Sequence, residues 1–198
     1  GAGPLELKRA IALLKEKNYG TPKVTSDNTV TGYIDGIEIS VPEGTSIMRA
    51  ASMVGIDIPS LCASDNLDAF GSCRLCIVDF EGRKGFGYPS SCTSPLNNGM
   101  KVTTKNNHLE SLRKDLLEMY ISDHPLDCNT CSSDGDCDLQ NQADNHNLLK
   151  NNHLLPSKYT FDDGCSHLGA DVDSSNPYFN FDTEKCIVCS RCVRACNE

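Results

Sequence analysis

The sequence lacks tryptophan, and aromatic residues make up only 6% of its 198 residues. It has no apolar run long enough to cross a membrane, and it does not open with the basic and apolar segments of a secretory signal. No segment is rich in lysine and arginine, and the formal net charge is −9. These absences argue against membrane insertion and against nucleic-acid binding, which needs a basic surface. We therefore expect a soluble, cytoplasmic protein.

Cysteine, by contrast, is abundant, with 12 residues. Three C-x2-C pairs suit metal binding better than disulfide formation, which indicates a reducing, intracellular setting. Bound metal would also stabilise a chain of this length, which can hold one large domain or two or three small ones with modest cores. Cys165 stands apart from the other cysteines, which form three groups. The groups are Cys62, Cys73, Cys76 and Cys92; Cys128, Cys131 and Cys137; and Cys186, Cys189, Cys192 and Cys196.

The first hundred residues predict an α+β fold. Apolar spacing indicates a short amphipathic helix over residues 5–17. Alternating apolar residues over 30–41, interrupted by Asp35-Gly36, predict a β-hairpin. A helix capped by Thr45 and ended at Gly55 should follow. This order of strand, strand and helix is how a β-grasp fold begins.

The first cysteine group has the order found in plant-type ferredoxins, in which C-x4-C-x2-C and a distant fourth cysteine hold a [2Fe–2S] cluster. Here six extra residues separate the first two cysteines. Strands are predicted over 75–80 and 101–104, with a turn at Glu81-Gly82 between them. We expect one [2Fe–2S] cluster at this group, and zinc is the alternative. The expected ligands are Cys62, Cys73, Cys76 and Cys92.

The second group follows a predicted helix, whose start at Asn107 with Glu110 resembles a capping box. Pro125 ends this helix beside His124, the non-thiolate residue able to complete a set of four ligands. Four ligands suit one iron–sulfur cluster or one zinc ion. We expect one [4Fe–4S] cluster with a histidine ligand. The expected ligands are His124, Cys128, Cys131 and Cys137.

Residues 141–177 are rich in Asn, Asp, Ser and Gly and predict an irregular linker. After it, the third group has the C-x2-C-x2-C-x3-C spacing of bacterial ferredoxins, in which the fourth cysteine binds a second cluster. Only half of such a domain is present, so we expect a truncated chain or a piece of a longer one. A further [4Fe–4S] cluster is expected only with the downstream half; otherwise the run holds no cluster or recruits Cys196 or Cys165 as a makeshift fourth ligand. The run is Cys186, Cys189, Cys192 and Cys196.

In the order and spacing of these three cysteine groups, the chain resembles the amino-terminal iron–sulfur region shared by several large NAD-linked enzymes. They are the respiratory NADH dehydrogenase large subunit, the NAD-dependent molybdenum or tungsten formate dehydrogenase alpha subunit, and the diaphorase and iron-only hydrogenases. The resemblance runs from about Val30 to Glu198 and covers all three cysteine groups. Segments 68–76, 81–85 and 122–128 are most similar to the formate dehydrogenase alpha subunit.

The resemblance implies a relay of electrons from a metal-pterin site that oxidises formate to a flavin that reduces NAD⁺. The implied partners are flavin- and NAD-binding diaphorase subunits and a metal-pterin catalytic domain, and no catalytic site is expected within this chain. The equivalent region of NADH dehydrogenase or of an NAD(P)-linked hydrogenase is the first alternative. A zinc-stabilised protein-interaction module is the second.

The expected organisation has four parts. A helix and linker occupy 1–28, a β-grasp [2Fe–2S] domain 29–105, a [4Fe–4S] domain with one histidine and three cysteine ligands 106–160, and a linker with a truncated ferredoxin segment 161–198. Two clusters with these ligands would take the formal charge from −9 to about −12, which suits docking on complementary protein surfaces.

Overall fold

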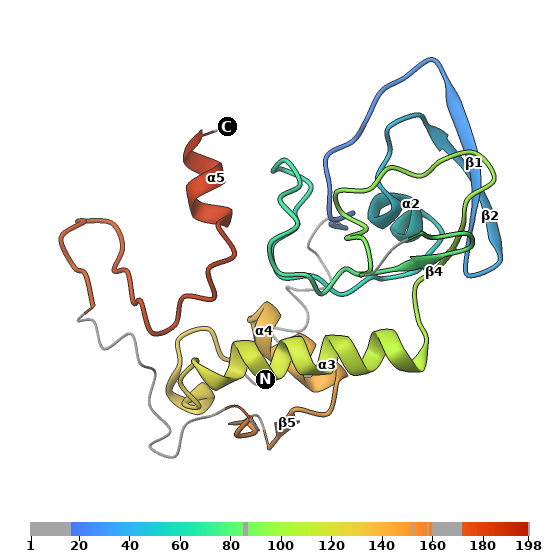
Figure 1. Cartoon of the computed structure of the whole chain (residues 1–198). Coiled ribbons are helices and arrows are strands. Elements are labelled where there is room, and N and C mark those ends of the chain that lie inside the picture. Colours follow the sequence, from blue (N-terminus) through green and yellow to red (C-terminus); the bar gives the residue numbers. More distant parts are fainter. Residues whose placement is uncertain (1–16, 85–86, 152, 158, 160–171, 198) are drawn as a thin grey trace, which may run out of the picture. The chain divides into compact units, whose positions relative to one another are not determined.

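The computed structural model describes residues 17–84, 87–151, 153–157, 159 and 172–197 (Figure 1). The helix predicted over 5–17 lies outside these residues except at its last position. The chain divides into two compact units. Among the described residues, we call those within 17–113 and 189–197 the sheet unit and those within 114–188 the loop unit, and describe each by itself.

The sheet unit is built on a mixed sheet of four strands in the order β2-β1-β4-β3. The predicted hairpin is present: β1 (Thr29–Ile34) pairs with antiparallel β2 (Ile37–Pro42) through a turn at Asp35 and Gly36. Both turn residues have positive φ, 48° and 83°, as a two-residue hairpin requires. β4 (Lys101–Thr103), the predicted closing strand, runs parallel to β1 and pairs on its other side with β3 (Asp79–Phe80).

The hydrophobic core lies between this sheet and helix α2 (Ile47–Met53). Alternate residues of the hairpin point inward, and the helix adds Ile47, Ala50 and Ala51, all without exposed surface. Each fully buried Ile, Val or Leu side chain stabilises the fold by roughly 1.5–3 kcal/mol. The predicted cap of this helix is wrong by one residue. Ser46 accepts from the backbone N–H of Arg49, whereas the Thr45 hydroxyl donates to the carbonyl of Pro42.

The strand predicted over 75–80 shrinks to Asp79–Phe80. The preceding residues make their hydrogen bonds elsewhere, because the carbonyls of Leu75 and Ile77 accept from the side chain of Arg113. Val78 donates to the carbonyl of Pro89 in a facing loop. This segment therefore supports a loop that carries cysteines and does not extend the sheet.

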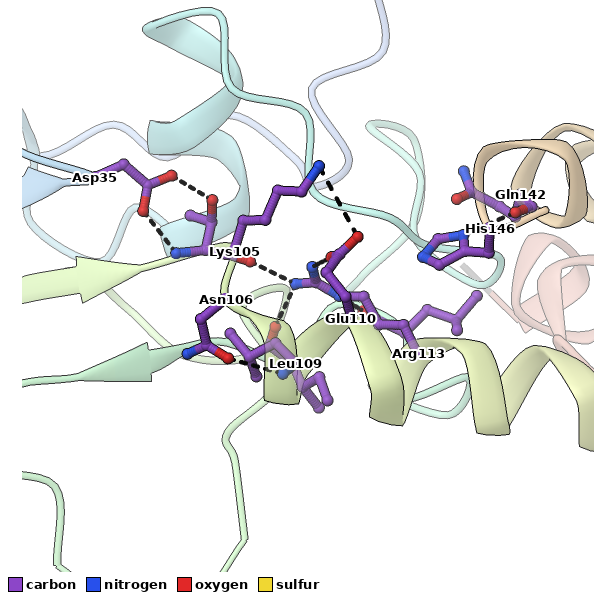
Figure 2. A network of polar contacts seen from close by, with 11 residues as sticks. Asp35, Lys105, Asn106, Leu109, Glu110, Arg113, Gln142 and His146 are labelled. Atoms are coloured by element: carbon purple, nitrogen blue, oxygen red, sulfur yellow. Dashed lines mark hydrogen bonds and ion pairs between the residues drawn. The ribbon is translucent and has the colours of Figure 1, made fainter.

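Helix α3 (Asn107–Ser122) begins where it was predicted, but its cap is Asn106, whose side chain accepts from the N–H of Leu109 at 2.8 Å. The expected capping box does not form at Asn107. Glu110 instead pairs with Arg113 at 2.7 Å (Figure 2). Arg113 is only 2% exposed, and it also donates to the carbonyl of Thr104. The first turns of α3 are thereby fastened to the sheet unit.

The loop unit contains the rest of α3, a 3₁₀ turn η1 (Cys128–Thr130), helix α4 (Asp138–Asn145), and the strand pair β5 (Leu149–Lys150) and β6 (His153–Leu154). The prediction of an irregular linker over 141–177 is wrong for residues 141–145, which form the second half of α4, and for the paired strands β5 and β6. The buried residues of this helix are Leu139, Gln140 and Ala143, so its sequence contains few apolar residues at helical spacing. Helix α5 (Arg191–Asn197) belongs to the sheet unit.

Candidate metal centres

The first candidate centre is formed by four buried cysteines of the sheet unit. Cys76 and Cys92 have their Sγ atoms 3.4 Å apart. The Cys73 thiol is hydrogen-bonded to Cys62, and the backbone N–H of Leu61 donates to its sulfur at 3.4 Å. The eleven cysteines within the described residues are free thiols. None of the four is more than 2% exposed: Cys62, Cys73, Cys76 and Cys92.

Each thiol pair holds a negative charge more easily than an isolated thiol. The pKa of Cys62 is lowered to about 5, mainly by the hydrogen bond from Cys73, against burial, and further by backbone N–H groups and by Arg194. The pKa of Cys92 is lowered chiefly by the hydrogen bond from Cys76. The pKa values of the donors Cys73 and Cys76 are raised for the same reason. Thiolate is the form that binds iron, so this donor set fits an iron–sulfur cluster.

The backbone around Cys73 has positive φ angles on both sides of this cysteine. Gly71 has φ 69°, and a Cβ atom there would lie 3.1 Å from Cγ2 of Thr93 and 3.2 Å from Oγ of Ser90. Its backbone N–H donates to Cys92, which is one cause of the lowered pKa of that thiol. Arg74 also has a positive φ, 59°. Glycine therefore allows the chain to approach Cys92 closely enough for its amide to stabilise the thiolate.

The second candidate centre is a cavity of about 130 Å³ in the loop unit. All four residues predicted for the second cluster line it, which brings His124 to the same space as the three thiols. The Nδ1 atom of His124 lies 2.9 Å from the carbonyl oxygen of Pro125. A carbonyl only accepts, so Nδ1 carries the proton in this contact and Nε2 keeps the lone pair that a metal ligand needs. The cysteines are Cys128, Cys131 and Cys137.

Two further residues of this cavity were missed in the sequence. Gln140 lines it and ties its loop together, accepting from the N–H of Gly135 at 2.9 Å and donating to Asp134 at 2.8 Å. Lys185 also lines it, with Nζ 3.5 Å from a carboxylate oxygen of Asp127. Burial acts to lower the pKa of Lys185, but the negative charges of Asp127 and Cys131 raise it overall. The position of Lys185, directly before the third cysteine group, was the available signal.

The third cysteine group is divided between the two units, because the boundary falls between Val188 and Cys189. Cys192 and Cys196 are exposed on α5, and Cys186 and Cys189 are partly buried. Their role as cluster ligands stays a prediction. Cys165 lies outside the described residues.

A zinc site brings its ligands to about 2.0–2.3 Å from one ion. Within the described ranges, no group of three or more His, Cys, Asp or Glu side chains is arranged to hold a single metal ion. No helix among the described residues is both long and apolar enough to span a membrane.

Two family models match the chain in these regions. Residues 27–107 match a 2Fe-2S iron-sulfur cluster binding domain, and residues 113–151 match the NADH-ubiquinone oxidoreductase-G iron-sulfur binding region. The two matched segments contain the first and second ligand sets. The chain is therefore an iron–sulfur protein that combines a [2Fe–2S] domain with a [4Fe–4S] region.

Curated relatives are similar to this chain over most of its length. The chain is 37% identical over 181 residues to the G subunit of NADH-quinone oxidoreductase from Streptomyces coelicolor, covering 90% of this chain and 20% of that protein. It is 37% identical over 175 residues to the NADP-reducing hydrogenase subunit HndD of Solidesulfovibrio fructosivorans, covering 85% of this chain and 28% of that protein. The chain thus spans only between a fifth and three tenths of the length of these relatives.

A solved structure of an NAD⁺-reducing [NiFe]-hydrogenase in the H2-reduced state is similar as well. The TM-score is 0.68 and the identity 34%, over 84% of this chain and 65% of that chain. The chain is thus similar, over most of its length, to part of the G subunits of NADH-quinone oxidoreductases and to part of an NAD⁺-reducing [NiFe]-hydrogenase.

Proposed function

We propose that this chain passes single electrons between a flavin- and NAD-binding partner and a second redox partner. The observation that carries the proposal is the pairing of two ligand sets with two matched regions: buried thiols in the sheet unit, and a histidine and three thiols around one cavity in the loop unit. Iron–sulfur clusters supply one-electron chemistry, which the protein tunes through charge, hydrogen bonds and burial.

The proposed ligands of the [2Fe–2S] cluster are the four cysteines of the first centre. Their burial excludes water, and backbone N–H groups offset the negative charge of the sulfurs. The proposed β-grasp fold places them in one loop system beside the sheet. The ligands are Cys62, Cys73, Cys76 and Cys92.

The [4Fe–4S] cluster would be held by three thiolates and a neutral imidazole. His124 presents Nε2 because Nδ1 is bound to the carbonyl of Pro125. A neutral ligand in place of a thiolate removes one negative charge and favours the reduced form. The other ligands are Cys128, Cys131 and Cys137. A third cluster at Cys186 to Cys196 belongs to the proposal only where a second cysteine run is present.

The parent complex is proposed to be an NADH-linked oxidoreductase or an NAD(P)-linked hydrogenase, because proteins of both names are similar over most of the chain. A narrower version of this proposal is that the parent complex is a formate dehydrogenase. It rests only on the resemblance of segments 68–76, 81–85 and 122–128. The proposed partners are diaphorase subunits in a reducing, cytoplasmic setting. A metal-pterin domain is a partner only in the narrower version.

Iron and acid-labile sulfide analysis with EPR of the reduced protein tests the proposal. We expect about six iron atoms per chain for one [2Fe–2S] and one [4Fe–4S] cluster, and about ten with a second [4Fe–4S] cluster. A colourless protein that binds zinc stoichiometrically would overturn it. Formate-dependent NAD⁺ reduction by this chain alone would contradict a role limited to electron transfer.

A further inference from the structure

Helix α5 contacts the loop between the first two cysteines through two arginines. Arg194 donates from Nη2 to the carbonyl of Cys62 and from Nη1 to that of Asp68, both at 2.5 Å. Arg191 donates to the carbonyl of Ala63 at 3.1 Å. These residues all belong to the sheet unit, although more than 120 positions separate them along the chain. Helix α5 is therefore joined directly to the first candidate centre.

The loop that receives these contacts lies between Cys62 and Cys73, and it is six residues longer than the corresponding loop in the plant-type spacing. It has little regular structure of its own: Ser64 and Leu67 form an isolated bridge, with one hydrogen bond of 3.4 Å. The buried carbonyl of Cys62 needs a donor, and α5 provides one. Arg194 is 9% exposed, and its guanidinium lies 5.7 Å from the centre of the Phe70 ring. The arginine is thus enclosed by the loop on more than one side.

Arg194 also brings a permanent positive charge to the first centre. Its guanidinium stays protonated at all relevant pH values. One of its nitrogen atoms lies 2.5 Å from the carbonyl oxygen of Cys62, so the charge is held beside a proposed ligand. A [2Fe–2S] cluster with four thiolates is formally −2 when oxidised, and reduction adds another negative charge. A nearby buried cation therefore favours the reduced state.

We propose that Arg194 is a positioning residue of the [2Fe–2S] centre, which fastens the C-terminal cysteine helix to the Cys62–Cys73 loop and holds the positive charge that raises the reduction potential of the cluster. Arg191 supports the same contact through Ala63. The proposal rests on the proposed [2Fe–2S] ligands, and its consequence is that docking of α5 and the redox state of the first centre are coupled.

The test compares three variants in the full, cluster-loaded chain. Arg194→Gln removes the charge and the forked donor, Arg194→Lys keeps the charge, and Lys101→Gln removes a charge from the exposed face of β4, where the side chain is 57% exposed. The readouts are the [2Fe–2S] potential, from an EPR-monitored titration, and amide hydrogen exchange of residues 61–70. Neither readout depends on enzyme activity.

For Arg194→Gln we expect the ratio of reduced to oxidised [2Fe–2S] cluster at fixed potential to fall about tenfold, equivalent to ~59 mV for one electron. We expect exchange in the loop to rise on the order of tenfold, since charged hydrogen bonds are lost. Arg194→Lys should share the faster exchange and keep most of the potential. Lys101→Gln should change neither.

Faster exchange with an unchanged potential in Arg194→Gln would show a merely structural role and overturn the redox part of the proposal. Unchanged exchange in both Arg194 variants would overturn the docking part. If Arg194→Gln fails to hold a cluster, Arg194→Lys decides through exchange and potential together. Absence of any [2Fe–2S] signal in the unsubstituted chain would contradict the proposed function instead, so the two failures are distinguishable.

Discussion

Arg113 and Leu75 are joined by a hydrogen bond of 3.1 Å from Nε to the carbonyl oxygen, across 38 positions of sequence. Leu75 lies between Cys73 and Cys76, so the bond connects helix α3 to the backbone that presents two proposed ligands. The same guanidinium donates to the carbonyls of Ile77 and Thr104. One buried arginine therefore supports the cysteine loop, the segment before β3 and the end of β4.

Replacing this arginine should destabilise the sheet unit. In Arg113→Met, three buried carbonyls lose their donor, and we expect a loss of about 3 kcal/mol in the free energy of unfolding. Urea unfolding followed by circular dichroism measures it. Lys105→Met is the matched control, because Lys105 is 75% exposed and only approaches Glu110 at 3.9 Å. Equal urea midpoints for the two variants would contradict this assignment.

The shape of the cysteine loop can be tested at two glycines with similar backbones. Gly71→Ala should reduce [2Fe–2S] loading severalfold, because it adds strain at φ 69° and contacts Thr93 and Ser90. Gly82→Ala has a φ of 75° but no atom within 4 Å of the added Cβ, so only strain of about 1 kcal/mol is expected. Iron content and visible absorption report the loading. Similar losses in both variants would mean that strain alone matters.

His124→Cys tests the proposed histidine ligand. The variant should keep a [4Fe–4S] cluster, and the extra thiolate should lower its reduction potential, since it adds a negative charge. EPR-monitored titration measures the change, with the [2Fe–2S] signal of the same sample as internal reference. An unchanged [4Fe–4S] potential would show that this ligand does not set it.

Lys185 should act on the same cluster from the wall of its cavity. Lys185→Gln removes a cation that lies 3.5 Å from Asp127, and we expect the [4Fe–4S] potential to fall while iron content stays the same. Lys150→Gln, on the exposed side of β5, is the control. If both substitutions move the potential equally, the effect comes from net charge rather than from the cavity.

The stability of the cluster-free chain should depend on pH through Cys62. Its pKa is about 5 when folded and near 9.0 in the absence of the fold, so the unfolded chain binds more protons between these values. Stability from this group should therefore rise as pH increases from about 5 to 9, and be lost as pH falls through 5. Urea midpoints across this range measure it. Cys62→Ser should flatten the profile, and an unaltered slope would contradict the assignment.

Local patterns predicted those parts of the chain whose hydrogen bonds are local. The hairpin at Asp35 and Gly36 and the strand at Lys101 are present because turn chemistry and alternation are short-range signals. The strand over 75–80 was overextended because Arg113, far along the sequence, takes up its carbonyls. Helix α4 was missed because only two of its buried residues, Leu139 and Ala143, are apolar and the rest of its sequence is polar.

The same distinction applies to the sites. Spacing in the sequence pointed to the first two cysteine groups and His124, which lie in a buried group of thiols and around a cavity, whereas the role of the third cysteine group stays a prediction. Arg194 and Lys185 were not found, because each acts on cysteines that are distant in sequence. Which charged side chains lie near a site depends on tertiary contacts, and the spacing of residues in the sequence does not reveal these contacts.

The parallel pairing of β1 with β4 has a consequence for the order of events during synthesis. β1 ends at Ile34 and its partner begins at Lys101, with all four proposed [2Fe–2S] ligands between them. The sheet cannot close before Lys101 has left the ribosome, and contacts between such distant segments form late in folding. The growing chain therefore displays its four cysteines as an open loop before the sheet closes. We expect the thiols to be most accessible to iron–sulfur delivery during this interval, because they are buried in the folded chain.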